Sequence, residues 1–153
     1  SLRSFRILCG DEVIASADST WALVGTEDGA LHKSGESGYA FEDEEAVTLS
    51  LPNRIRFPAG IPLKKIGERR VVYSDLDYNM HMNNTVYPDM LCAFLDMQNK
   101  YVRHLSINYF HEAPLNETLT VFMQETENDV HLFRTLREDG QTNVEAAITL
   151  SEL

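Results

Sequence analysis

The chain has 153 residues, 43% of them apolar and 24% charged, which is typical of a folded domain rather than a disordered segment. Its formal net charge of −11 argues against nonspecific binding to nucleic acid or to an anionic membrane. No apolar run approaches the roughly 20 residues that span a bilayer.

The first segment predicts a β-hairpin over residues 4–24. Phe5 and Ile7 alternate, residues 9–12 supply a turn with glycine, and the apolar return strand contains Trp21. Residues 25–67 are rich in Gly, Pro and acidic side chains, which predicts loop and places a boundary within this stretch.

The rest of the chain predicts one helix among five strands. A short strand at 70–74 is followed by Leu91, Phe94 and Leu95 at helical spacing, which predicts a helix over 88–101. Alternating apolar residues then predict strands at 103–112, 118–126, 130–137 and 143–151. We therefore expect an α+β fold in which a curved antiparallel sheet wraps around the helix.

The densest polar cluster comes just before the predicted helix. Asp77, Asn79 and His81 occur at i, i+2 and i+4, so in an extended segment their side chains leave the backbone on one side. A carboxylate, an amide and an imidazole on one face can hold and activate a water molecule. The same residue types are typical of turn and helix-cap hydrogen bonds, so capping and catalysis are both possible functions of this cluster.

A metal site is a weaker interpretation of this cluster. Asp75, Asp77 and Asn79 resemble the opening of a calcium loop, but Met80 and Val86 stand where that loop needs Gly and Glu. We expect no metal and no other cofactor.

Six basic residues gather in the stretch 54–70 of an otherwise acidic chain. They could bind an acidic partner or a phosphate, or they could simply be solvated. They are Arg54, Arg56, Lys64, Lys65, Arg69 and Arg70.

Residues 74–87, SDLDYNMHMNNTVY, closely resemble the SDLDxNxHVNNxxY signature of acyl-acyl carrier protein thioesterases. Residues 108–113 are similar to the Tyr-x-x-Glu-Cys strand end of that family. Members carry two hotdog domains in tandem, with the signature before the central helix of the second. The resemblance implies a hotdog domain over 68–153, a linker at 36–67 and, in residues 1–35, a C-terminal hairpin remnant of the first hotdog domain.

The resemblance also implies roles for four side chains: Asp77, Asn79, His81 and Glu112 match the residues credited with catalysis. Ala113 stands where plant members often have Cys, so a cysteine nucleophile is impossible at that position. An activated water is favoured instead, with either Asp77 or Glu112 as its base.

The expected function is hydrolysis of acyl-acyl carrier protein thioesters to free fatty acid, with the carrier protein docking on the basic residues. Two alternatives stay open, an acyl-CoA thioesterase of the same fold and a non-catalytic acyl-binding or assembly module. We expect no nucleic-acid or membrane partner, and either a homo-oligomer or pairing with a missing N-terminal hotdog half. Cys9 and Cys92 belong to no CxxC pair, which fits a reducing cytosol, so we expect a cytoplasmic protein.

Overall fold

The computed structural model describes residues 2–25, 27–33, 54–126 and 129–153. The chain forms two compact units, Ser1–Asn53 and Arg54–Leu153. The boundary between them falls within the predicted linker at 36–67, most of which lies outside the described residues.

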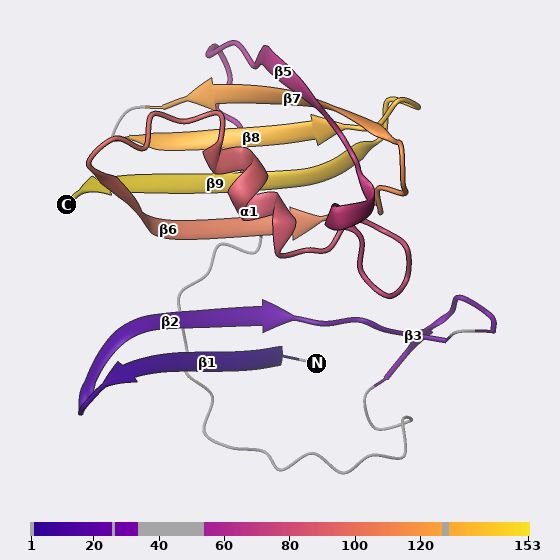
Figure 1. Ribbon diagram of the computed structural model, residues 1–153, viewed down its shortest axis with the longest axis horizontal. Coiled ribbons are helices and arrows are strands. Elements are labelled where there is room, and N and C mark those ends of the chain that lie inside the picture. The colour runs from indigo at the N-terminus through magenta and orange to yellow at the C-terminus, as the bar shows by residue number, and fades with distance from the viewer. Residues whose placement is uncertain (1, 26, 34–53, 127–128) are drawn as a thin grey trace. The chain divides into compact units, whose positions relative to one another are not determined.

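The N-terminal unit contains the predicted hairpin. Strand β1 (Leu2–Cys9) pairs antiparallel with β2 (Glu12–Thr20), and the short strands β3 (Leu23–Val24) and β4 (Leu31–His32) form a second pair (Figure 1). Gly10 in the first turn has a φ of +61°, a conformation that side chains other than glycine rarely adopt.

Most large apolar side chains of this hairpin are exposed. The exposed fractions are 53% for Phe5, 59% for Ile7 and 59% for Ile14. Trp21 covers the Arg3 guanidinium, whose central carbon lies 4.9 Å from the ring centroid. The described residues of this unit therefore form a paired ribbon without a buried apolar core.

The C-terminal unit is built on one five-stranded antiparallel sheet in the order β5-β7-β8-β9-β6 (Figure 1). A turn with Gly140, whose φ is +81°, joins β8 to β9. The strands are β5 (Lys64–Arg70), β6 (Lys100–Tyr109), β7 (Thr118–Glu125), β8 (Val130–Leu136) and β9 (Thr142–Glu152).

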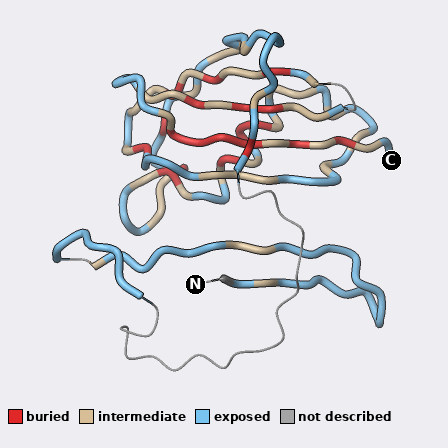
Figure 2. Tube along the Cα trace, turned by 180° about the vertical axis from the view of Figure 1, so that it is seen from behind, coloured by how far each residue is buried: buried red, intermediate tan, exposed pale blue. Residues whose placement is uncertain are grey.

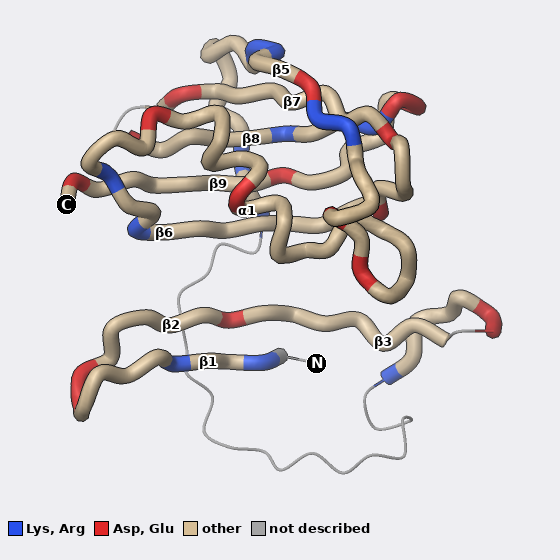
Figure 3. Tube along the Cα trace, viewed as in Figure 1, with Lys and Arg blue, Asp and Glu red and all other residues tan. Residues whose placement is uncertain are grey.

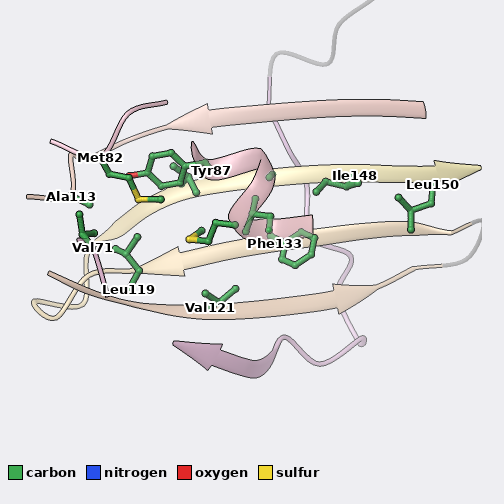
Figure 4. Packing of buried hydrophobic residues seen from close by; sticks show 13 residues of the cluster. Val71, Met82, Tyr87, Ala113, Leu119, Val121, Phe133, Ile148 and Leu150 are labelled. Atoms are coloured by element: carbon green, nitrogen blue, oxygen red, sulfur yellow. The ribbon is translucent and has the colours of Figure 1, made fainter. Parts of the chain in front are cut away.

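A single short helix, α1 (Val86–Cys92), lies against one face of this sheet (Figures 1 and 4). Tyr87, Met90 and Leu91 point from it into the core, where they meet apolar side chains of the central strands. Phe133 of β8 and Ile148 of β9 are fully buried in that cluster. Figure 2 shows the buried residues following the central strands of the sheet. The predicted α+β fold with a single helix on a large antiparallel sheet is confirmed.

Two predicted elements differ from the structure. The helix ends at Cys92 rather than at residue 101, because the chain continues in single turns and Asn99 adopts a left-handed φ of +58° before β6. The short strand expected at 70–74 is replaced by β5, which ends at Arg70, and by the 3-10 turn η2 (Tyr73–Asp75). Strand β5 thus begins inside the stretch that the sequence treats as linker.

None of the helices among the described residues has the length and apolar character needed to cross a membrane.

Candidate active site

The segment that carries the motif is a tight turn, so the one-sided arrangement that an extended segment would give Asp77, Asn79 and His81 does not apply. The backbone N–H of Asp77 donates to the carbonyl of His81 at 2.9 Å, and Leu76 and Met82 form a bridge across the turn. Met80 at its tip has a φ of +65°, which is uncommon for a residue other than glycine.

The Asp77 carboxylate holds this turn together. Its Oδ1 atom accepts hydrogen bonds from the backbone N–H groups of Asn79, at 2.9 Å, and His81, at 3.3 Å. This is the turn chemistry typical of an Asx residue. Asp77 therefore fixes the backbone of His81, while the exposed Asn79 side chain makes no hydrogen bond with any described residue.

The structure brings His81 together with Glu112. The His81 Nδ1 atom lies 3.1 Å from the Glu112 Oε2 atom, although the two residues are far apart in the sequence. The side chains are 33% and 74% exposed, so both reach solvent. A backbone hydrogen bond of 2.8 Å from the Met82 N–H to the Ala113 carbonyl holds the two segments side by side.

The pair lines an open cleft of about 420 Å³. Its walls also include Phe110, His111, Pro114 and Arg137. Neither Asp77 nor Asn79 lines the cleft. Arg137 comes from the turn after β8, so the sequence motif gave no signal for it.

A buried polar network is bonded to the backbone of His111, one of the residues that line the cleft. The side chain of Asn143 donates to the Tyr87 hydroxyl at 3.0 Å and also to the His111 carbonyl. The Thr135 hydroxyl donates to the side-chain Oδ1 atom of Asn143 at 2.9 Å. Asn143 and Thr135 are 0% exposed.

Two tyrosines beside this network have shifted pKa values. Burial raises the pKa of Tyr87, the negative charge of Glu112 raises it further, and the hydrogen bond with Asn143 opposes the change. Burial also raises the pKa of Tyr109 to about 12. The Tyr109 hydroxyl donates to the Asn84 backbone carbonyl at 2.9 Å, and its ring meets Tyr87 edge to face. Both phenols are therefore neutral structural groups near neutral pH.

The six basic residues have different surroundings. Arg69 donates twice to the buried Asp75 carboxylate, at 2.8 and 2.9 Å, so its charge is already paired within the C-terminal unit. Lys65 pairs with Glu68 and Arg70 with Asn116. The remaining three, Arg54, Arg56 and Lys64, are exposed and make no ion pair with described residues. Figure 3 shows basic residues at both ends of β5, with an acidic stretch between them.

Solved structures share this fold. An acyl-ACP thioesterase from Bacteroides thetaiotaomicron is 19% identical with a TM-score of 0.74, over 98% of this chain and 62% of that chain. A putative oleoyl thioesterase from Lactobacillus plantarum is 22% identical with a TM-score of 0.71, over 99% of this chain and 63% of that one. This chain thus spans about three fifths of each. A Staphylococcus aureus protein solved with CoA is 16% identical with a TM-score of 0.52, over 59% and 77%.

The sheet and its helix thus have the hotdog fold. The family model of the acyl-ACP thioesterase C-terminal domain matches residues 63–152, and the chain belongs to this family. Among curated proteins, none matches the sequence.

Proposed function

We propose that this protein hydrolyses acyl thioesters with a water molecule activated at the His81–Glu112 pair, and that its substrate is an acyl group on acyl carrier protein. The observation that carries the proposal is the 3.1 Å contact between the two side chains at the mouth of an open cleft. Membership of the acyl-ACP thioesterase family supports the choice of reaction and carrier.

Glu112 is the stronger candidate for the base. Its carboxylate is solvent-accessible, lines the cleft and contacts an imidazole, whereas one oxygen of Asp77 is committed to the turn. In the proposed reaction, water attacks the thioester carbonyl carbon as Glu112, oriented by His81, takes its proton. The carbon–sulfur bond then breaks, and the proton passes to the departing thiolate. Acid and thiol are the products.

Asp77 and Asn79 have supporting roles in this proposal. Asp77 holds the backbone of His81 in place and so acts through the turn rather than on the water. Asn79 does not line the cleft, so its exposed amide is proposed to bind a part of the substrate that lies outside it.

The catalytic proposal is tested by turnover of one fatty acyl group on the carrier protein. Glu112→Gln and His81→Ala should each lower kcat by about 10²–10⁴, the usual contribution of a general base. Glu125→Gln, which changes an exposed glutamate at the end of β7, is the matched control. Equal kcat values in Glu112→Gln and in this control would reject the site.

The carrier is tested by comparing kcat/KM for carrier-protein and CoA esters of the same acyl group. Equal values would favour the acyl-CoA alternative, for which the similarity to a structure solved with CoA is the supporting observation. Tight binding of the thioester without turnover would favour the non-catalytic alternative.

We propose that the carrier docks on the exposed basic residues of the stretch 54–70. Charge reversal at Arg56 and Lys64 should raise KM for the carrier ester most at low salt, since surface attraction is screened by ions. Arg103→Glu on the edge strand β6 is the control. An unchanged KM in the double variant would reject the dock.

A further inference from the structure

Glu112 has little packing of its own. Its side chain is 74% exposed, so its position depends on the backbone to either side. On the C-terminal side, the carbonyl of Ala113 accepts from Met82, next to His81. The N-terminal side, at Phe110 and His111, lies just beyond the end of β6 and so outside its regular pairing with β9.

Asn143 supplies that second attachment. Its backbone carbonyl accepts hydrogen bonds from the N–H groups of Phe110, at 2.9 Å, and His111, at 3.3 Å. Its side-chain amide donates to the carbonyl of His111. One buried residue thus binds three backbone groups immediately before Glu112.

The same amide also connects to the helix after the motif turn. Asn143 Nδ2 donates to the Tyr87 hydroxyl, and Tyr87 belongs to α1, five residues after Met82. Asn143 therefore joins the segment carrying Glu112 to the helix that follows His81. A contact of 3.1 Å between those two side chains is sensitive to small displacements of either segment.

Local irregularity in the sheet aims Asn143 at this junction. In the β8–β9 pairing, Arg134 is opposite Glu145 and Leu136 is opposite Thr142, so β9 has one extra residue here. Such a bulge turns a side chain away from its regular direction. The Thr135 hydroxyl beside the bulge donates to Asn143 Oδ1, which leaves the amide N–H groups for His111 and Tyr87.

We propose that Asn143, oriented by Thr135, is a positioning residue that sets the contact between His81 and Glu112. This rests on the proposed function for its kinetic consequence, but the geometric claim is independent of it. Asn143 does not touch the reacting groups; it acts through the backbone of residues 110–111 and through Tyr87.

The kinetic test uses a conservative pair at the orienting hydroxyl. Thr135→Val removes the hydroxyl and Thr135→Ser keeps it. Thr135→Val and Asn143→Asp should lower kcat about 10–100-fold with KM nearly unchanged, while Thr135→Ser retains wild-type kcat. Gln124→Met removes a buried amide that binds the Pro58 and Ile61 carbonyls, and it is the control for stability loss elsewhere in the sheet.

A double-mutant cycle separates positioning from general damage. In a Glu112→Gln background, Thr135→Val should cost little further kcat, because the group that it positions is already gone. An equal further loss in that background would overturn the proposal. Wild-type kcat in folded Thr135→Val and Asn143→Asp variants would do the same.

A second readout needs no activity. The ¹⁵N NMR signal of the His81 Nδ1 atom in the full chain reports its contact with Glu112. Thr135→Val, Asn143→Asp and Glu112→Gln should all move that signal in the same direction, and Gln124→Met should not. An unmoved signal in the Asn143 and Thr135 variants would overturn the inference. A moved signal in a protein without turnover would leave it standing while the proposed function fails.

Discussion

Two antiparallel strand pairs of similar length occur in this chain, and their surroundings differ. The β1–β2 pair is matched along most of both strands, with one register shift between Ile7 and Leu8, while Phe5 and Ile7 stay more than half exposed. In the β8–β9 pair, Phe133 and Ile148 are fully buried in the core cluster that also contains the apolar side chains of α1 (Figure 4). Backbone hydrogen bonds replace equivalent bonds with water, so they contribute only modestly to the free energy of folding. Strand pairing alone therefore gives a marginally stable hairpin, and apolar burial supplies most of the stability of the sheet that α1 covers.

The candidate site follows the same division. Every residue of the cleft and of the buried polar network belongs to the unit with the buried core. The His81–Glu112 contact joins two exposed side chains that are held by buried backbone. Mutations that weaken the core should therefore affect the site as well as stability.

Hydrogen exchange should show the largest difference between the two pairs. We expect amides in the centre of β8 and β9 to open only with global unfolding, which for typical domains costs about 5–15 kcal/mol. Amides of β1 and β2 should exchange at least about 10³-fold faster, because an isolated two-stranded hairpin is marginal in water. Mass spectrometry or NMR on the full chain measures both sets together.

Slow exchange in β1 and β2 would break this comparison. It would show that the hairpin packs its exposed apolar side chains against another surface. A hotdog remnant, as the family resemblance implies for residues 1–35, would pack in this way, and that packing stays a prediction.

A matched pair of phenylalanine variants gives the next largest difference. Phe133→Ala removes a fully buried ring and should lower the free energy of unfolding by about 3–5 kcal/mol. Phe5→Ala removes a ring that is 53% exposed and should change it by less than about 0.5 kcal/mol. Urea unfolding measures both midpoints, and equal losses would mean that Phe5 is buried in solution.

How far the sequence predicts this structure depends on the range of the interactions involved. The strands follow from local alternation, and β7, β8 and β9 lie within about two residues of their predicted bounds. The predicted helix is too long at its C-terminal end. Phe94 and Leu95 continue the helical spacing in the sequence, but in the structure they pack against the core from isolated turns that follow α1. Apolar periodicity cannot distinguish these two backbones.

Two of the four candidate site residues lie in contact, and sequence reasoning missed the residues that support them. The motif and the strand end indicated His81 and Glu112, which the structure places in contact. The turn made by Asp77 is local but depends on backbone dihedral angles, such as the positive φ of Met80, that residue spacing does not specify. Asn143 and Arg137 reach the site only through a bulge and a turn in the folded sheet, so no local pattern indicates them.

Two ion pairs of the basic stretch, Arg69–Asp75 and Lys65–Glu68, should differ less in their contribution to the free energy of unfolding. Asp75 is 5% exposed and accepts from the Val72 N–H as well as from Arg69, whose side chain is 35% exposed. Asp75→Ala should cost about 2–3 kcal/mol, since it leaves these donors without their partner. Lys65→Ala breaks a pair exposed on both sides and should cost about 0–1 kcal/mol.

Salt sharpens this test. Raising the ionic strength should reduce the Lys65 effect and leave most of the Asp75 effect, because buried pairs are screened less. Thermal or urea unfolding at two salt concentrations measures both. Equal losses of unfolding free energy in the two variants would mean that Arg69 behaves as a surface charge. Arg69 would then be a candidate for binding the carrier protein.

The two cysteines give the smallest difference, one of rate rather than stability. Cys9 at the end of β1 is exposed, whereas Cys92 at the end of α1 is partly buried. Burial raises the pKa of the Cys92 thiol, and the negative charge of Asp89 raises it further. Since the thiolate is the reactive form, iodoacetamide at pH 8 should modify Cys9 first.

Raising the pH should reduce the difference between the two modification rates, because Cys92 with its raised pKa forms thiolate only at higher pH than an ordinary cysteine does. Asp89→Asn removes one of the two causes and should speed modification of Cys92 without affecting Cys9. Peptide mass spectrometry over a time course resolves the two sites. Faster modification of Cys92 than of Cys9 would mean that the end of the hairpin is covered in solution. Slow hydrogen exchange in β1 and β2 would then be expected as well. Together, these two results would contradict the division into an exposed hairpin and a buried core.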